Sequence, residues 1–216
     1  MAKRDGGRKS REQLSRRRTP ELGYYIIVTN AKETEQNYFY GLRDSIPKEL
    51  QGKLVIKVCR SKTAVMVDEA LRIASLHPQY GEPWIIFDRD RVMDFDRIIE
   101  LAQEKGVHVG WSNPCIEVWF HTYFGTMPAF ADSVSCCSGF RDTYCRVCGQ
   151  DYSKTDDDVY RKLCRFGDEE QAIRIAKQKN LEHQRNRITS PSEMCPATTV
   201  HILVEKIMKS ITGKSD

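Results

Sequence analysis

The chain has 216 residues, of which 40% are hydrophobic, so it is long enough to bury the core of one large globular domain. No apolar run in the sequence reaches the roughly 20 residues that a membrane-spanning helix needs. The basic amino terminus also lacks the apolar stretch of a secretory signal. These features exclude an integral membrane protein and predict a cytoplasmic one, in which the eight cysteines are reduced thiols or metal ligands rather than disulfides.

The net charge of +4 is concentrated at the amino terminus. Residues 1–20 hold eight Lys and Arg residues against two acidic ones, and the densest part is Arg16, Arg17 and Arg18. Because this tail has little apolar surface, we expect it to be disordered and to contact nucleic-acid phosphates without reading sequence. A solvated leader without a partner is the alternative.

Strand and helix patterns alternate through residues 21–125. Strands are expected at residues 24–29, 54–59, 84–87 and 107–111. Helices are expected at residues 35–45, 63–76, 95–102 and 115–124. This alternation predicts a Rossmann-like α/β domain, with a largely parallel sheet flanked by helices.

Residues 126–216 give no further strand signal. A segment bearing Cys, Ser and Gly extends to Gln150, and helices are expected at residues 156–165, 168–180 and 198–211. Thr198 is a suitable N-cap for the last helix. We therefore expect a Cys-bearing segment and a helical C-terminal extension, both packed on the α/β domain.

Two aspartates follow the third expected strand directly. Asp88 and Asp90 stand at positions i and i+2 after the apolar run of residues 84–87. Both carboxylates should therefore lie at the carboxyl end of this strand, where ligands of parallel sheets bind. Such a pair can share one Mg²⁺ or Mn²⁺ ion. Acidic pairs at strand ends also cap helices and form turns, which is the alternative.

Asn113 and Glu117 follow the next expected strand and should reach the same edge of the sheet. Glu117 is flanked by apolar residues, and a buried glutamate without a partner costs free energy. A position beside the cation of Asp88 and Asp90 is the interpretation that fits best. The Asn-Pro pair at Asn113 is also typical of a turn or a helix cap.

Three strings occur in the order seen in RloB-like proteins: residues 28–39 (VTNAKETEQNYF), 87–90 (FDRD) and 112–119 (SNPCIEVW). Residues 198–203 (TTVHIL) resemble the last helix of that family, so the likeness spans residues 22–211. RloB-like proteins are associated with bacterial phage defence and resemble the Toprim group. Nucleases of that group hold Mg²⁺ with a glutamate after the first strand and a DxD after a later one. The resemblance thus implies a Toprim fold and a metal-dependent nuclease.

Compared residue by residue, the resemblance places the DxD on Asp88 and Asp90 but the glutamate of the first turn on Asn30. Asparagine can accept a hydrogen bond or weakly ligate a metal, but it cannot exchange a proton. Glu33 or Glu35, from the same turn, could replace the missing carboxylate.

The resulting hypothesis is a Mg²⁺-dependent nuclease that cleaves DNA or RNA in antiviral defence, with Asp88, Asp90 and Glu117 at the metal. Arg89, Arg91 and Asn113 are candidate contacts to the nucleic acid, although exposed arginines without a ligand are equally expected. The competing hypothesis, which Asn30 favours, is a catalytically weakened nucleic-acid-binding or regulatory subunit that works with another defence protein. A nucleotidyl transferase is a third, because primases share the Toprim site.

Four cysteines lie within thirteen residues: Cys136, Cys137, Cys145 and Cys148. Four thiols suffice for tetrahedral Zn²⁺, and the C-x-x-C that ends this segment resembles half of a zinc knuckle. Adjacent cysteines are awkward ligands for one ion, so the site could recruit a replacement from a set of three residues: Cys164, Cys195 and His121. The alternative is a segment of reduced thiols without a metal.

Overall fold

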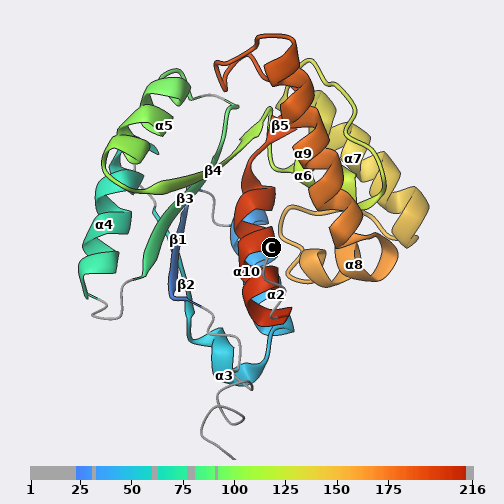
Figure 1. The fold of residues 1–216 in the computed structure, drawn as a ribbon. Helices are drawn as coiled ribbons and strands as arrows, with labels where there is room; N and C mark the ends of the chain where they lie inside the picture. The colour runs from blue at the N-terminus through green and yellow to red at the C-terminus, as the bar shows by residue number, and fades with distance from the viewer. Residues whose placement is uncertain (1–22, 31–32, 60–62, 77–80, 91, 213–216) are drawn as a thin grey trace, which may run out of the picture.

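The computed structural model of the chain describes residues 23–30, 33–59, 63–76, 81–90 and 92–212 (Figure 1). The predicted basic tail of residues 1–20, which includes Arg16, Arg17 and Arg18, lies outside the described residues, as does Arg91. Among the residues described, no helix combines the length and the apolar character needed to cross a bilayer.

Within the described residues, five strands form one sheet in the order β2-β1-β3-β4-β5. They are β1 (Tyr25–Thr29), β2 (Leu54–Val58), β3 (Glu82–Asp88), β4 (His108–Asn113) and β5 (Ala197–Thr198). The first four run parallel, and β5 pairs antiparallel with β4. Because β2 lies on one side of β1 and β3 on the other, the winding direction reverses between β1 and β3. Ligands of open α/β sheets bind at such a switch point, outside the carboxyl ends of the strands.

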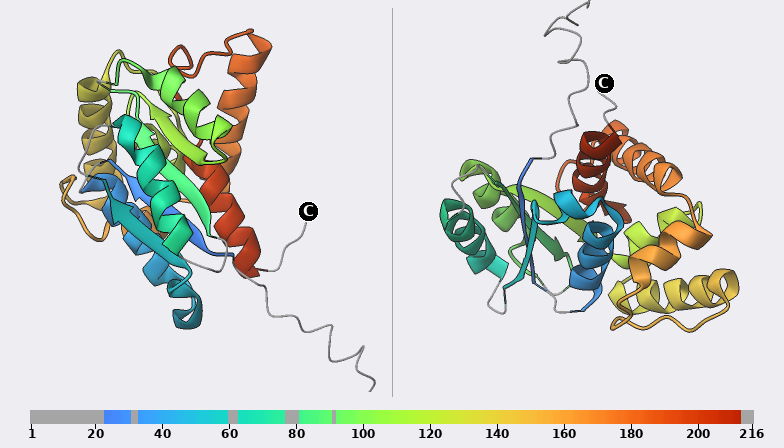
Figure 2. Two further views of the ribbon diagram at one scale, coloured as in Figure 1. Left: turned by 90° about the vertical axis from the view of Figure 1, so that its left-hand side faces the viewer. Right: turned by 90° about the horizontal axis from the view of Figure 1, so that it is seen from below.

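Helices cover both faces of this sheet. On one face lie α4 (Met66–Leu76) and α5 (Phe95–Glu104), and on the other lie α2 (Thr34–Ser45) and α10 (Val200–Thr212) (Figures 1 and 2). Four helices form the rest of the carboxyl-terminal half: α6 (Glu117–Tyr123), α7 (Ser133–Cys148), α8 (Val159–Phe166) and α9 (Glu169–Arg185). Two short elements precede β2 and α4: α3 (Lys48–Gln51) and the 3₁₀ turn η1 (Thr63–Val65). This is the Rossmann-like arrangement that the alternating patterns predict.

The two faces of the sheet are buried in separate apolar cores, because successive side chains of a strand point to opposite faces. In β1, Ile26 and Val28 belong to the core under α4 and α5, while Ile27 belongs to the core on the other face. Phe140 of α7 and Leu163 of α8 are part of the same core as Ile27. The carboxyl-terminal helices therefore share a core with the sheet.

Helix α7 was not expected from the sequence. It begins at a capping box in which Ser135 N–H donates to Asp132 Oδ1 at 2.7 Å, while Asp132 N–H donates to Ser135 Oγ at 3.2 Å. It ends at Gly149, whose φ of 68° lies in the left-handed region. Inside the helix, Gly139 is needed because a Cβ there would lie 2.7 Å from the Phe130 ring. Glycine and small polar residues have low helix propensity, so local pattern alone did not predict this helix.

Strand β5 was also missed, because two residues show no period-2 pattern. The side chains of Thr198 and Thr199 form hydrogen bonds with the backbone at the outer edge of β4. Trp111 N–H donates to Thr199 Oγ1 at 2.9 Å, Thr199 Oγ1 donates to Val109 O at 3.2 Å, and Thr198 Oγ1 donates to Trp111 O at 3.0 Å. Thr198 Oγ1 also accepts from Val200 N–H at 3.2 Å and so satisfies the first amide of α10.

Candidate functional site

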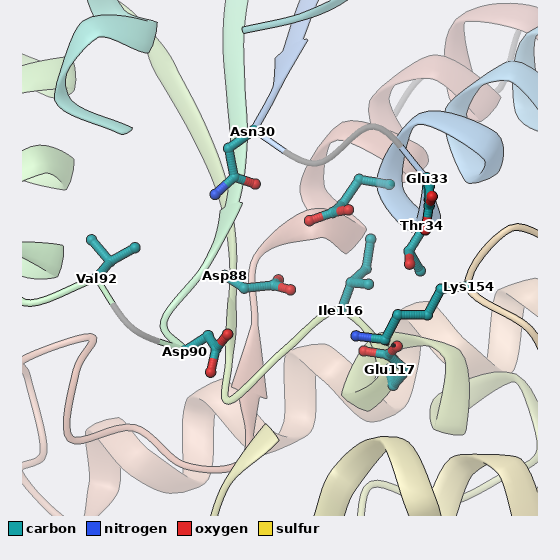
Figure 3. Close-up of a pocket in the computed structure, with 10 residues that line it drawn as sticks. Asn30, Glu33, Thr34, Asp88, Asp90, Val92, Ile116, Glu117 and Lys154 are labelled. Atoms are coloured by element: carbon teal, nitrogen blue, oxygen red, sulfur yellow. Dashed lines mark ion pairs between the residues drawn. The ribbon is translucent and has the colours of Figure 1, made fainter. Parts of the chain in front are cut away.

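A pocket of about 370 Å³ opens at the carboxyl ends of β1, β3 and β4, beside the switch point of the sheet (Figure 3). Ten residues line it: Asn30, Glu33, Thr34, Glu35, Asp88, Asp90, Val92, Ile116, Glu117 and Lys154. The structure therefore brings Asp88, Asp90 and Glu117 together with the turn that follows the first strand. Their placement at the strand ends predicted this convergence.

Backbone hydrogen bonds beyond the end of β3 position the DxD segment. Arg89 N–H donates to Ser112 O at 2.8 Å, and Asp90 N–H donates to Pro114 O at 3.1 Å. The contact with the β4 side thus continues past Asp88, and alternate side chains of an extended segment point to the same side. Asp88 and Asp90 therefore line the pocket, whereas Arg89 does not.

The Asp88 carboxylate has few hydrogen-bond donors. The Ile116 backbone N–H donates to it, but its Oδ1 is buried and has no hydrogen-bond partner among the described residues. Burial, and then the negative charges of Glu35 and Glu117, raise the pKa of Asp88 well above its ordinary value. In Figure 3 this carboxylate points across the pocket toward Glu117 and Lys154. A cation bound there would relieve both the burial cost and the repulsion.

Two buried glutamates complete the acidic cluster. Glu35, in the first turn of α2, is 3% exposed, and Glu117, at the start of α6, is 1% exposed. Burial, with a contribution from Glu117, raises the pKa of Glu35 to about 7, although its own backbone amide and Lys154 act in the opposite direction. Glu117 Oε1 accepts a hydrogen bond from Tyr152 OH at 3.1 Å and lies 3.7 Å from Lys154 Nζ.

Lys154 is the one basic residue among the described residues that line the pocket. It comes from the loop between α7 and α8, and its side chain is 54% exposed. Burial disfavours its charge, but Glu117 and Cys137 outweigh that effect, so the pKa of Lys154 is raised. One ammonium group therefore faces several carboxylates. Neither Lys154 nor Tyr152 was predicted from the sequence, because their loop is distant along the chain and has no recognisable motif.

Asn30 and the two glutamates near it have different positions in the pocket. Asn30 follows β1 and lies on the strand side of the pocket, near Asp88 (Figure 3). Glu33 is exposed, whereas Glu35 is buried. Of the two predicted replacements for the missing carboxylate, Glu35 is thus the one enclosed with Asp88. Asp90 is exposed and accepts a hydrogen bond from Ser133 Oγ at 2.6 Å.

Arg89 and Asn113, two predicted nucleic-acid contacts, are engaged within the fold. Arg89 Nη1 donates to Val92 O at 2.9 Å, and its guanidinium carbon lies 5.8 Å from the centre of the Phe95 ring. Asn113 is 4% exposed, and its Nδ2 donates to the carbonyls of residues 191 and 192 at 3.2 and 3.0 Å. Asn113 is thus buried in a turn-stabilising role and is not placed to contact nucleic acid. Arg89 braces the loop after β3 but is only half-buried, and its contact with nucleic acid stays a prediction.

The predicted four-cysteine zinc knuckle is wrong. Cys136 and Cys137 lie near the start of α7, and Cys145 and Cys148 lie in its last turn. With a helical rise of roughly 1.5 Å per residue, the two pairs stand about 12 Å or more apart along the helix axis. Zn–S bonds of about 2.3 Å cannot span that distance. All eight cysteines lie in described segments and none forms a disulfide.

His121, considered as a replacement zinc ligand, lies among aromatic rings rather than in the lining of the pocket. Its ring centre is 5.3 Å from those of both Phe130 and Phe140. Burial lowers its pKa to about 4, against an opposing effect of Glu117. Both of its ring nitrogens are buried, and neither has a hydrogen-bond partner in the part of the chain that the structure describes.

Fold and site together define a Rossmann-like α/β protein with an acidic pocket at the switch point of its sheet. The model of the RloB-like protein family matches residues 25–207. The chain therefore belongs to the RloB-like family, as the order of its three sequence strings implied. The matched residues include every residue that lines the pocket. No curated protein and no solved structure matched the chain significantly.

Proposed function

We propose that this protein is a divalent-metal-dependent nuclease of the Toprim type, which cleaves phosphodiester bonds of DNA or RNA in defence against phage. One observation carries the proposal: Glu35, Asp88 and Glu117 converge in a single pocket in which Asp88 Oδ1 has no partner among the described residues. Carboxylate oxygens are the ligands that Mg²⁺ and Mn²⁺ prefer. Membership of the RloB-like family and the DxD at the strand end support the same reading.

The residues present fit a hard cation. Asp88 and Glu117 offer oxygen ligands from two neighbouring chain segments, and the exposed Asp90 offers a third from the same DxD. A bound Mg²⁺ would polarise a substrate phosphate and lower the pKa of an attacking water. Because Mg²⁺ usually retains several waters, a few carboxylates at an open pocket are sufficient to hold it.

The remaining residues of the pocket can bind the substrate and move a proton. The half-exposed ammonium group of Lys154 can contact a phosphate oxygen. Asn30 can donate a hydrogen bond from its amide or orient a water, but it cannot carry a proton. Glu35 reaches the pocket from the first turn of α2 and can hold and release the proton at its carboxylate. Glu35 is therefore the general acid–base group in this proposal.

The second candidate function is a nucleic-acid-binding or regulatory subunit that has lost catalysis and works with another defence protein. Asn30 favours it, since a neutral amide lines the pocket where the Toprim resemblance implies a carboxylate. In both cases we propose the cytoplasm as the place of action, because eight unpaired thiols suit a reducing compartment.

Cleavage assays on panels of labelled DNA and RNA test these functions. The nuclease proposal expects cleavage by the full chain in Mg²⁺ or Mn²⁺ and none in EDTA. The Asp88→Asn, Asp90→Asn double variant should lose about 100-fold or more of this activity. Asp142→Asn, an exposed aspartate on α7, is the matched control and should retain it.

The outcomes separate the candidates. Binding of nucleic acid without metal-dependent cleavage would support the regulatory subunit. Metal-dependent cleavage that survives the double substitution would place the active site elsewhere in the protein and overturn the proposal.

A further inference from the structure

Two thiols and one carboxylate meet beside the acidic pocket. Cys115 Sγ and Cys137 Sγ lie 3.9 Å apart, and a Glu117 carboxylate oxygen lies within 4.8 Å of both sulfur atoms. Cys115 is in the turn between β4 and α6, Cys137 is near the start of α7, and Glu117 opens α6. Two segments that are distant along the chain, residues 115–117 and the start of α7, thus bring potential metal ligands to one point, which the spacing of the cysteines along the chain did not indicate.

We propose that Cys115, Cys137 and Glu117 form a Zn²⁺ site that shares Glu117 with the acidic pocket, so that bound Zn²⁺ weakens the binding of Mg²⁺ in that pocket. The competition, though not the zinc site itself, rests on the proposed function. Tetrahedral Zn²⁺ with Zn–S bonds near 2.3 Å separates two sulfur ligands by about 3.8 Å. The observed separation of 3.9 Å between Cys115 Sγ and Cys137 Sγ meets this requirement without movement of the backbone.

Zn²⁺ and Mg²⁺ prefer different types of ligand. Thiolates are soft ligands that select Zn²⁺ over Mg²⁺, whereas the all-oxygen set around Asp88 suits Mg²⁺ or Mn²⁺. Glu117 lies between the two sets, since it belongs both to the acidic pocket and to the thiol group. A carboxylate drawn toward the thiols is no longer available to a cation at Asp88.

An ion can reach this site from solvent. Cys115 is 3% exposed, but Cys137 is half-buried and lines a neighbouring cavity of about 500 Å³ together with Asp90 and Lys154. Lys154 Nζ lies 3.7 Å from Glu117 Oε1 in the acidic pocket. Its side chain is 54% exposed, so it can turn into solvent when Zn²⁺ takes its place. Three protein ligands then leave a fourth position for water, as in open zinc sites.

Direct Zn²⁺ titration of the reduced, full-length chain against a chromophoric chelator tests the site without any nucleic acid. We expect one Zn²⁺ per chain, with affinity lowered roughly 100-fold or more by Cys115→Ser and by Cys137→Ser. The matched control is Cys145→Ser, an exposed cysteine at the far end of the same helix, which should bind Zn²⁺ as the wild type does. Absence of bound Zn²⁺ in the wild type, or unchanged affinity in both variants, overturns the site.

Two measurements on the wild type avoid dependence on how the variants fold. Zn²⁺ should protect Cys137 from alkylation, as read by mass spectrometry of peptides, and should leave the exposed Cys145 unprotected. Equal labelling of Cys137 with and without Zn²⁺ overturns the proposal. Co²⁺ in place of Zn²⁺ should produce the charge-transfer absorption of thiolate ligands, and a spectrum without that absorption also overturns it.

Mn²⁺ binding, followed by its paramagnetic effect on water relaxation, tests the shared carboxylate. Loading the wild type with Zn²⁺ should weaken Mn²⁺ binding about tenfold or more, and Cys137→Ser should abolish this effect. Full Mn²⁺ affinity in the Zn²⁺-loaded protein would overturn the sharing of Glu117. A metal-free chain that binds no Mn²⁺ would instead overturn the proposed function, while the titration above still decides the zinc site.

Discussion

Two sites with buried or half-buried carboxylates differ in whether the carboxylate oxygens have hydrogen-bond donors. In the first, Glu169 at the start of α9 accepts hydrogen bonds from Tyr123 OH at 2.9 Å and Tyr160 OH at 3.1 Å. Tyr123 OH is in turn 2.8 Å from Tyr38 OH of α2. These phenols link α2, α6, α8 and α9 through one half-buried carboxylate that has its donors in place.

The acidic pocket is the opposite case. Glu35, Asp88 and Glu117 are enclosed together. Within the described residues, Tyr152 OH donates a hydrogen bond to Glu117, but Asp88 Oδ1 has no hydrogen-bond partner. Buried polar groups in native proteins are normally paired, so an unpaired buried oxygen needs an explanation. The comparison teaches that the hydrogen bonds of Glu169 stabilise helix packing, whereas the acidic pocket has the unpaired, like-charged carboxylates on which our proposal of a bound cation rests.

The largest predicted effect is a change in the cleavage rate when a carboxylate is placed at Asn30, where the Toprim resemblance implies one. Asn30→Glu should increase metal-dependent cleavage about tenfold or more, because it adds a hard oxygen ligand and a group that exchanges protons. Initial rates at saturating Mg²⁺ measure the gain. Glu33→Gln, at the exposed rim, should leave the rate unchanged, whereas Glu35→Gln should abolish cleavage if Glu35 carries the proton. An unaltered rate in Asn30→Glu together with an active Glu35→Gln would contradict this account.

Removing a carboxylate should change the free energy of unfolding in opposite directions at Glu169 and at Asp88. Glu169→Ala should lower the free energy of unfolding by about 2 kcal/mol, because it leaves the hydroxyls of Tyr123 and Tyr160 without their acceptor. Asp88→Asn should raise it in metal-free protein, because it removes a charge repelled by Glu35 and Glu117. Denaturant unfolding in EDTA gives both values. If Asp88→Asn destabilises the metal-free protein, the pocket is not under electrostatic strain.

A smaller effect, whose direction can be predicted, is the pH dependence of stability that Glu35 causes. The pKa of Glu35 is about 7 in the fold, above its ordinary value of 4.5. Between these values the folded state binds more protons than the unfolded state, so this contribution to stability is full below about 4.5 and is lost as pH rises through about 7. In EDTA, the Tm of wild type relative to that of Glu35→Gln should therefore fall between pH 5 and pH 8.

Mg²⁺ should reverse that trend, since the ion and the proton compete for the same carboxylates. The increase in Tm caused by Mg²⁺ should be larger at pH 8 than at pH 5. A Tm difference that does not vary with pH would mean that Glu35 titrates normally and that the pocket is more hydrated than its burial implies.

The smallest predicted effect concerns His121, whose buried ring nitrogens have no hydrogen-bond partner among the described residues. Its ring packs against those of Phe130 and Phe140. His121→Phe should raise the free energy of unfolding by about 1 kcal/mol, because two unpaired nitrogens leave an apolar environment. Denaturant unfolding measures it. A destabilised variant with lost Zn²⁺ or Mn²⁺ binding would show instead that His121 serves a ligand.

The sequence predicted the sheet and the DxD edge because both depend on short-range patterns. Apolar runs marked the parallel strands, and Asp88 and Asp90 stood directly after one of them. Glu117 could be assigned to the same edge because it follows the next strand in the chain. The acidic part of the pocket was therefore predictable from strand ends alone.

The parts that were not predicted depend on long-range packing. Lys154 and Tyr152 come from the loop between α7 and α8 and contact Glu117 at the start of α6, and no local sequence pattern encodes these contacts. Long-range packing also brings Cys115 and Cys137 together. The spacing of the cysteines along the chain suggested instead a set of four zinc ligands within α7, which the geometry of a helix does not allow. Asn113 was misassigned because burial, rather than residue type, decides whether an amide serves the fold or a ligand.

Thr198 of β5 and the following Thr199 determine how the sheet can meet another chain. An edge strand normally presents unpaired amides and carbonyls, which can recruit a strand from a partner or from a second copy. Here Thr198 and Thr199 occupy the Trp111 N–H and the Val109 and Trp111 carbonyls of β4. The β4 edge is thus closed by the two-residue strand β5, by the Thr199 N–H, which donates to Trp111 O at 2.8 Å, and by the two threonine side chains. A partner that extends this sheet by β-augmentation would have to approach from β2, on the side of the switch point away from Glu117.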